Sequence, residues 1–176
     1  MIYNNNYIQT ILLTMDTGTE IYFYRLNNKF GYLSNFYQTN FVDEHGNMFN
    51  CSEQYFMYHK CLTFDKKNKK LLNAILAEES PKQIKSYGRQ VKNYSDEVWN
   101  DLRFDIMLNG LRLKFNQNPI LKQKLIDTKD KMLFEASKYD DIWGIGFEDY
   151  EAIKKDKSEF GRNLLGLALM SLRTEL

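Results

Sequence analysis

Short blocks of hydrophobic residues separated by turn formers fill the first third of the chain. The β-branched and aromatic run Ile21-Tyr22-Phe23-Tyr24 ends before Asn27-Asn28, a turn-forming pair, and this predicts a short strand. Two more apolar pairs, Phe41-Val42 and Met48-Phe49, flank the turn formers Asp43 to Asn47 and predict a hairpin. We therefore expect strands and loops in this third of the chain.

From residue 50 onward the hydrophobic spacing is typical of helices. Asn50 or Ser52 can cap the first of them, and with Asn50 as the cap, Glu53 completes the spacing of a capping box. Later helices are predicted over residues 66–77, Pro81 to Gly88, Ser95 to about Pro119, Leu121 to Ile126, and Asn163 to Arg173. Met132-Leu133-Phe134 is predicted to be a buried strand or extended segment.

The length of 176 residues fits one domain. We expect a single domain over residues 20–176. Residues 1–19, rich in Asn and Thr, are expected to form an extension that is flexible or adds a strand.

Charge and hydropathy narrow the possible partners. With 24 basic and 23 acidic side chains the formal net charge is +1, so any contact with phosphate must come from a local cluster of cations. No stretch approaches the roughly 20 apolar residues of a membrane helix, and no Lys or Arg precedes Arg25 as a signal peptide would require. We expect no membrane partner and a cytoplasmic location.

Cysteine and histidine are sparse. Cys51 and Cys61 are too few for a disulfide scaffold and indicate a reducing compartment. His45 and His59 show no metal-binding spacing, so we expect a mechanism without a metal and without a cofactor. Aromatic residues make up 15% of the chain, and they can fill a core or stack on flat ligands.

The strongest chemical candidate is Glu53, in the first turn of its predicted helix. A helix N-terminus favours a carboxylate for structural reasons alone, and the same position suits a group that activates water or stabilises a cation. Lys60 and Arg89 are candidate phosphate ligands, with ordinary solvated charge as the alternative. Arg103 lies four residues after Trp99, and this spacing favours a stacked pair at the surface.

A second group of unusual residues lies between Tyr139 and Gly146. Asp140 and Asp141, the indole of Trp143 and two glycines could frame a sugar and a base, or they could form a core tryptophan beside an acidic turn. Further along, Asn163 is expected to cap the last helix, because the glycines around it do not have dinucleotide-binding spacing.

Taken in order, these segments resemble the NADAR (YbiA-like) family over about residues 20–174. The matching stretches are Tyr32-Leu33-Ser34-Asn35-Phe36-Tyr37, Cys51-Ser52-Glu53-Gln54-Tyr55-Phe56 with Lys60, Gly88-Arg89, Trp99 through Arg103 and Met107, Lys114-Phe115, Glu135-Ala136-Ser137, Trp143-Gly144-Ile145-Gly146, and Asn163-Leu164-Leu165-Gly166 with Met170 and Arg173. No single stretch is decisive, but the ordered set is specific.

The resemblance implies a helix-rich α+β domain, with a small hairpin or sheet near the N-terminal third, that hydrolyses N-glycosidic bonds without a metal. One branch of the family acts on phosphoribosylamino-pyrimidine intermediates of riboflavin biosynthesis and releases ribose 5-phosphate and the base. Another branch removes ADP-ribose from nucleic-acid bases. We expect the first activity, on a small phosphorylated ribosyl substrate.

The resemblance also assigns site residues. Glu53 is the leading catalytic group, with Asp140 or Asp141 as a second carboxylate. The expected substrate-binding residues are Asn35, Tyr55, Lys60, Arg89, Glu135, Trp143, Gly144 and Asn163. This chain departs from the family at Phe160-Gly161, where relatives commonly have Trp before the glycine.

Two alternatives stay open at this point. The chain could be an ADP-ribosyl glycohydrolase that works on modified nucleic acid, which the near-neutral charge mildly disfavours. It could also be a module that binds ADP-ribose or a nucleotide without turnover, which the presence of Glu53 argues against. The sequence identifies no protein partner.

Overall fold

A computed structural model describes residues 16–176, which form two compact units. Unit 1 consists of Lys124–Leu176 with the described part of Met1–Ser34, and unit 2 is Asn35–Gln123. Most of the predicted N-terminal extension, residues 1–15, lies outside the described residues. Just after it, Asp16 forms an isolated antiparallel bridge with Ile21.

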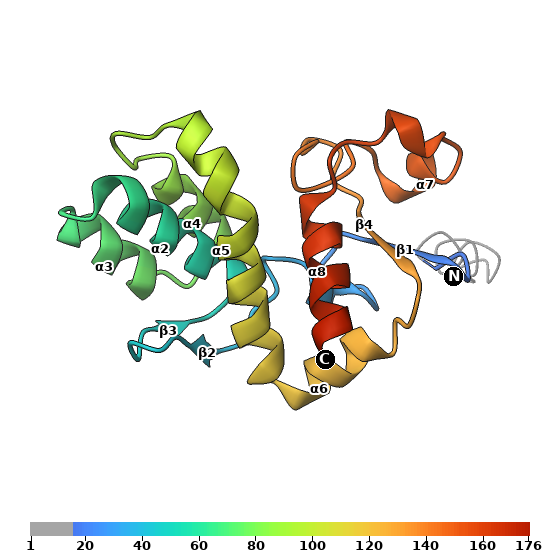
Figure 1. Ribbon diagram of the computed structural model, residues 1–176, viewed down its shortest axis with the longest axis horizontal. Coiled ribbons are helices and arrows are strands. Elements are labelled where there is room, and N and C mark those ends of the chain that lie inside the picture. The colour runs from blue at the N-terminus through green and yellow to red at the C-terminus, as the bar shows by residue number, and fades with distance from the viewer. Residues whose placement is uncertain (1–15) are drawn as a thin grey trace, which may run out of the picture. The chain divides into compact units, whose positions relative to one another are not determined.

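Unit 2 is a small hairpin followed by helices, as the hydrophobic pattern predicted. Strands β2 (Phe41–Val42) and β3 (Met48–Phe49) pair in antiparallel register, with Phe41 opposite Phe49. The helices are α2 (Ser52–Asp65), α3 (Lys69–Ala77), α4 (Pro81–Gly88) and α5 (Asp96–Asn116), drawn on the left in Figure 1. Helix α5 begins directly after Ser95, as predicted, and the Ser95 hydroxyl caps it by accepting a hydrogen bond from the Val98 N–H at 3.4 Å.

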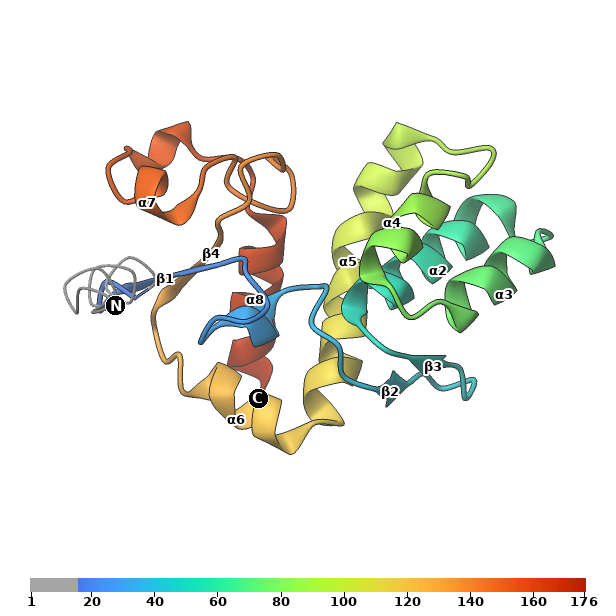
Figure 2. The same ribbon diagram turned by 180° about the vertical axis from the view of Figure 1, so that it is seen from behind.

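Helices α2 and α5 pack against each other and run in opposite directions, as both ribbon views show (Figures 1 and 2). Near the end of α2, the ring of Phe64 lies 5.9 Å from that of Trp99, at the start of α5. Near the beginning of α2, Tyr55 lies so close to Gly110, late in α5, that a Cβ at Gly110 would meet its ring at 2.6 Å. The order of these contacts fixes which part of α5 faces which part of α2.

Unit 1 is built around two strands that are far apart in the sequence. Strand β1 (Glu20–Phe23) pairs in parallel with β4 (Met132–Glu135), and Ile21 lies opposite Leu133. Helix α8 (Leu164–Glu175) packs against β4 and buries most of its leucines, as its apolar sequence predicted. Helix α6 (Pro119–Ile126) carries the chain from unit 2 into unit 1.

The helix-rich α+β class with small sheets is confirmed, and three short elements were not predicted. These are the 3-10 turns η1 (Gly31–Leu33) and η2 (Lys157–Glu159) and the single-turn helix α7 (Asp149–Ala152). Helix α7 begins with a capping box between Glu148 and Glu151. Such single turns are too short to produce a hydrophobic period in the sequence.

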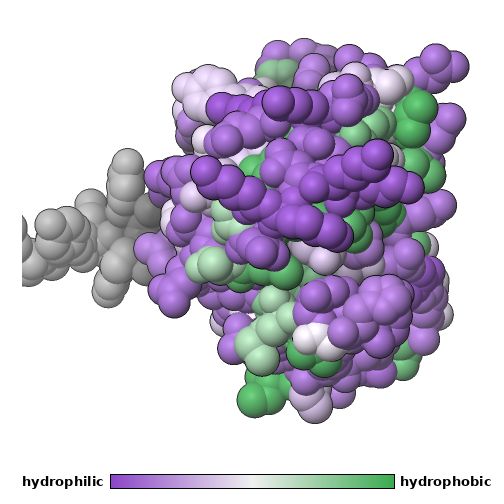
Figure 3. All heavy atoms as spheres, turned by 90° about the vertical axis from the view of Figure 1, so that its left-hand side faces the viewer, coloured by the Kyte–Doolittle hydropathy of each residue, from purple (hydrophilic) through white to green (hydrophobic). Residues whose placement is uncertain are grey.

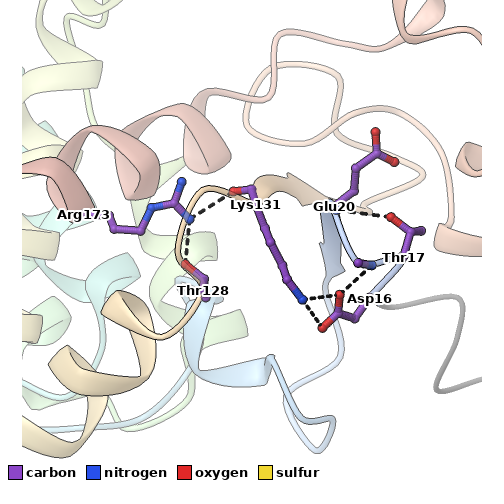
Figure 4. Close-up of polar contacts among 7 residues, drawn as sticks. Asp16, Thr17, Glu20, Thr128, Lys131 and Arg173 are labelled. Atoms are coloured by element: carbon purple, nitrogen blue, oxygen red, sulfur yellow. Dashed lines mark hydrogen bonds and ion pairs between the residues drawn. The ribbon is translucent and has the colours of Figure 1, made fainter.

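Polar contacts tie the segments around the β1–β4 pair together (Figure 4). The Lys131 ammonium lies 2.6 Å from a carboxylate oxygen of Asp16, in the turn before β1. On the other side, the Arg173 guanidinium donates to the Thr128 hydroxyl at 2.7 Å and to the Lys131 carbonyl at 3.0 Å. The end of α8 is thereby held against the loop that leads into β4.

The surface shows no large apolar area where Figure 3 displays it. Hydrophilic side chains cover most of that face, and hydrophobic residues show there in small separate areas. Single exposed hydrophobic residues are ordinary in water-exposed surfaces. Within residues 16–176, no helix has both the length and the apolar composition needed to cross a bilayer.

We predict that Gly166→Ala destabilises the protein, although alanine normally stabilises a helix relative to glycine. A Cβ at position 166 would overlap the Leu133 carbonyl oxygen and crowd the Asn163 side chain. Overpacking of this kind costs about 1–3 kcal/mol. Urea unfolding should show a lower free energy of unfolding, whereas the half-exposed neighbouring change Leu167→Ala should have a smaller effect. An unchanged or higher stability for Gly166→Ala would show that α8 does not pack closely on β4.

Candidate functional site

Glu53 is the second residue of α2 and is buried there, with 5% of its surface exposed. Its backbone N–H donates to the Asn35 carbonyl at 3.1 Å. A carboxylate in this position lies at the positive end of the helix dipole, which stabilises its ionised form. The structure therefore brings together Glu53 and Asn35, two of the predicted site residues.

The predicted cap of α2 is wrong. The N-cap residue is Cys51, which makes no side-chain capping hydrogen bond, and neither Asn50 nor Ser52 occupies that position. The reciprocal contact comes from Gln54, whose side-chain oxygen accepts from the Asn50 N–H at 2.7 Å. The Gln54 amide also donates to the carbonyls of Ile75 and Glu78, at 2.8 and 3.0 Å. Gln54 thus anchors the start of α2, so that the neighbouring Glu53 is not needed for the predicted capping box.

Two buried polar atoms beside Glu53 have no hydrogen-bond partner among the described residues. They are the side-chain oxygens of Asn35 and Ser52, in residues that are 7% and 1% exposed. Buried polar atoms are normally satisfied, so unpartnered ones indicate a place where water or a ligand binds. Ser52 directly precedes Glu53 in the sequence, and the backbone carbonyl of Asn35 accepts the hydrogen bond from the Glu53 N–H.

Lys60 lies on the same side of α2 as Phe56, one turn further along the helix. Its ammonium is 4.3 Å from the ring centre of Tyr94 and 6.0 Å from that of Trp99, so it faces aromatic rings. Burial lowers the pKa of Lys60, while the charges of Asp96 and Glu53 act in the opposite direction. Lys60 lies seven residues after Glu53, so the two side chains share one face of α2, two turns apart.

Two of the three arginines of unit 2 carried predictions, and the structure contradicts the one for Arg103. Arg89, predicted as a phosphate ligand, is exposed at the end of α4, where its backbone N–H donates to the Ser86 carbonyl at 3.2 Å. Arg103, predicted to lie at the surface, is buried with 8% of its surface exposed, and that prediction is wrong. The spacing from Trp99 was correct, but this face of α5 points to α2, because Trp99 packs on Phe56 at 4.9 Å.

Tyr55, predicted to help hold the base, lies in the hydrophobic cluster that joins the hairpin to α2. Its ring is 5.1 Å from that of Phe49 and 4.1 Å from that of His59. Burial raises the pKa of the Tyr55 hydroxyl to about 12. The packing accounts for the residue, and its role in binding the base stays a prediction.

The remaining predicted residues belong to unit 1: Glu135 ends β4, Asn163 precedes α8, and the others lie in the loop after β4. The Asp140 carboxylate accepts hydrogen bonds from the Ile142 and Trp143 N–H groups, at 3.1 and 2.8 Å, and so shapes the turn. Asp141 is exposed. Gly144 is buried, and a Cβ there would lie 2.8 Å from the carbonyl oxygens of Glu135 and Asp140. The loop thus requires glycine at this position on steric grounds.

Asn163 precedes α8, as predicted, but its side chain is used elsewhere. It has left-handed backbone angles and makes no capping hydrogen bond. Its amide donates to the Leu133 carbonyl at 2.8 Å, and its oxygen accepts from the Glu135 N–H at 3.1 Å, so it pairs with the edge of β4. Nearby, Phe160 packs edge-on against Phe134 at 5.4 Å, which shows how an aromatic residue other than tryptophan fills this position.

Lys114, quoted above only as part of a matching stretch, is completely buried. Its ammonium lies 5.6 Å from the ring centre of Tyr37 and 5.2 Å from that of Phe115. Burial lowers its pKa to about 7, with a smaller opposing effect of Cys51, the residue that precedes α2. This burial could not be predicted from the sequence, because a lysine near a helix end is usually solvated. Among the described residues no group of three His, Cys, Asp or Glu side chains could hold a metal ion.

Comparison with known proteins places the chain in context. Residues 22–176 match the family model described as the NADAR domain. The chain is 41% identical over 127 residues to "N-glycosidase R617" of Acanthamoeba polyphaga mimivirus, covering 70% of this chain and 72% of that protein. It is 30% identical over 158 residues to "N-glycosidase YbiA" of Shigella flexneri, covering 90% of this chain and 89% of the relative.

Two further comparisons concern function names and fold. The chain is 33% identical over 156 residues to "Riboflavin biosynthesis protein VVA0006" of Vibrio vulnificus, covering 89% of this chain but 38% of that longer protein. The NMR structure of the E. coli protein YbiA aligns with a TM-score of 0.72 at 28% identity, covering 89% of this chain and 84% of that one.

We predict that stability rises with pH between pH 7 and 8.5 because of Lys114. Its pKa in the folded protein, about 7, lies below its ordinary value of 10.5, so the unfolded chain binds more protons over this range. Urea unfolding at the two pH values should show a larger gain for the wild type than for Lys114→Met. Equal gains for the two proteins would mean that Lys114 does not titrate on unfolding in this range.

Proposed function

The chain belongs to the NADAR family and is a hydrolase of N-glycosyl compounds, and we propose that its substrate is a phosphoribosylamino-pyrimidine intermediate of riboflavin biosynthesis. The observation that carries the proposal is the buried carboxylate of Glu53 at the start of α2, with the partly buried Lys60 two turns further along the same face of the helix. The riboflavin names of several relatives support the choice of substrate.

In the proposed reaction, water adds to the anomeric carbon of the ribose and the bond from that carbon to the amino nitrogen breaks. One hydrogen of the water goes to the departing nitrogen, so the products are ribose 5-phosphate and the free amino-pyrimidine. The transition state has positive charge at the anomeric carbon, as in other glycoside hydrolyses. A carboxylate beside that carbon can orient the water and stabilise the charge.

The surroundings of Glu53 fit this role. The helix dipole of α2 favours the ionised carboxylate, and the neighbouring unpartnered oxygens of Asn35 and Ser52 can accept hydrogen bonds from the attacking water or from ribose hydroxyls. Gln54 fixes the backbone on which Glu53 stands through its hydrogen bonds to Asn50, Ile75 and Glu78. Such fixed geometry is what a catalytic carboxylate needs.

Lys60 provides a cation for the substrate phosphate. Because its ammonium faces the rings of Tyr94 and Trp99, it is only partly compensated, and an arriving phosphate would improve its environment. Two groups of residues in unit 1 keep their predicted roles as predictions. Asp140 or Asp141 is predicted to be the second catalytic carboxylate. The predicted substrate-binding residues there are Glu135, Trp143, Gly144 and Asn163.

We predict that Glu53→Gln abolishes release of the base from a phosphoribosylamino-pyrimidine while the protein stays folded. Glutamine keeps the shape of the side chain but removes the charge that stabilises the transition state, and we expect a rate loss of at least about 100-fold. Glu97→Gln is the matched control, because Glu97 is also the second residue of its helix but is exposed. Chromatography of the free base measures both variants.

The same assay on ADP-ribosylated guanine separates the alternatives. Release of ADP-ribose from that substrate, without turnover of the pyrimidine, would replace the proposed function with reversal of nucleic-acid modification. Binding of either substrate without turnover would indicate a non-catalytic module. Full activity of Glu53→Gln on the pyrimidine would refute the role of Glu53.

A further inference from the structure

Arg103 is a buried cation whose environment within the described residues does not account for it. Its side chain is 8% exposed, and its Nε atom is buried without a hydrogen-bond acceptor among the described residues. No carboxylate in this part of the chain forms an ion pair with it. Burying a charge without a partner costs free energy, so a residue kept in this state calls for a ligand that supplies the missing negative charge.

The packing of α5 on α2 turns Arg103 toward the inside of the helix pair. Trp99 contacts Phe56 and Gly110 contacts Tyr55, so both positions lie on the α5 face that packs against α2. Arg103 lies one turn after Trp99 and two turns before Gly110, so it shares that face. Glu53 belongs to the helix on which this face packs.

Lys60 is a second cation beside the N-terminal part of α5. Its ammonium lies 4.3 Å from the ring centre of Tyr94 and 6.0 Å from that of Trp99, the residue one turn before Arg103. A guanidinium fork and an ammonium together suit a phosphate group, whose oxygens can accept hydrogen bonds from both.

We propose that Arg103 binds the phosphate monoester of the substrate, together with Lys60, and so selects phosphorylated ribosyl compounds. This inference rests on the proposed function for the identity of the phosphate carrier. It assigns to Arg103 the role that the sequence alone gave to Arg89. Arg103 contacts the phosphate and not the bond that breaks, so it contributes to binding and specificity.

The test uses Arg103→Met and Arg103→Lys, Arg89→Gln for the rival phosphate ligand, and the exposed control Arg25→Gln, with ribose 5-phosphate and ribose as probes. Titration calorimetry should show that the wild type binds ribose 5-phosphate and binds ribose much more weakly. Arg103→Met should weaken binding of ribose 5-phosphate about 10- to 100-fold, because a charged hydrogen-bonding partner is lost. Arg103→Lys should recover part of this loss, and Arg25→Gln should bind as the wild type does.

Thermal unfolding without ligand gives a second readout that a structural arginine would not produce. Because methionine fills similar space without an unpartnered charge, Arg103→Met should unfold at the same or a higher temperature than the wild type. Failure of Arg103→Met to fold, or its unfolding well below the wild type, would show that Arg103 stabilises the fold and would overturn the proposal.

Wild-type affinity of Arg103→Met for ribose 5-phosphate would overturn the proposal, as would loss of binding in Arg89→Gln instead. The fate of the proposed function is read separately, from release of the base. Binding of ribose 5-phosphate that depends on Arg103, without any base release, would refute the proposed reaction and support the phosphate site. Base release with an unchanged KM in Arg103→Met would support the reaction and refute the phosphate site.

Discussion

The burial of charged side chains is the constraint on which the organisation of unit 2 depends. Glu53, Arg103 and Lys114 each have less than a tenth of their surface exposed, in a unit of fewer than 90 residues whose core is otherwise aromatic and aliphatic. Removing charges from water costs free energy that only close partners or a ligand can offset. The contacts that offset this cost therefore constrain how α2, which carries Glu53, and α5, which carries Arg103 and Lys114, pack within the unit.

The fold supports these charges with side chains that hydrogen-bond to the backbone. Gln54 links the start of α2 to the end of α3 and so fixes Glu53 without contacting a substrate. Asn163 has the same function in unit 1, where its amide bridges the edge of β4 at Leu133 and Glu135. In both cases a side-chain amide forms hydrogen bonds with backbone N–H and C=O groups near the end of a helix or along a strand edge. Such backbone groups need a partner when they are buried.

Much of the fold followed from the sequence, because the hairpin, the helices and β4 each carry a local hydrophobic period. The pairing of β1 with β4 did not, since paired residues such as Glu20 and Met132 are 112 positions apart and leave no local signal. Glu53 and Asn35 could be selected from helix chemistry and family resemblance. Arg103 was placed on the wrong side because a spacing of four residues from Trp99 defines a common helix face without saying whether that face is inside.

The central claim is that the site in unit 2 cleaves phosphoribosyl N-glycosides. The most direct measurement compares kcat/KM for a phosphoribosylamino-pyrimidine with kcat/KM for the same compound after removal of its phosphate. The account predicts release of the free base from both, with the phosphorylated compound preferred by about 100-fold or more, as two charged contacts to phosphate would give. Equal kcat/KM values, or no release of base from either compound, would contradict it.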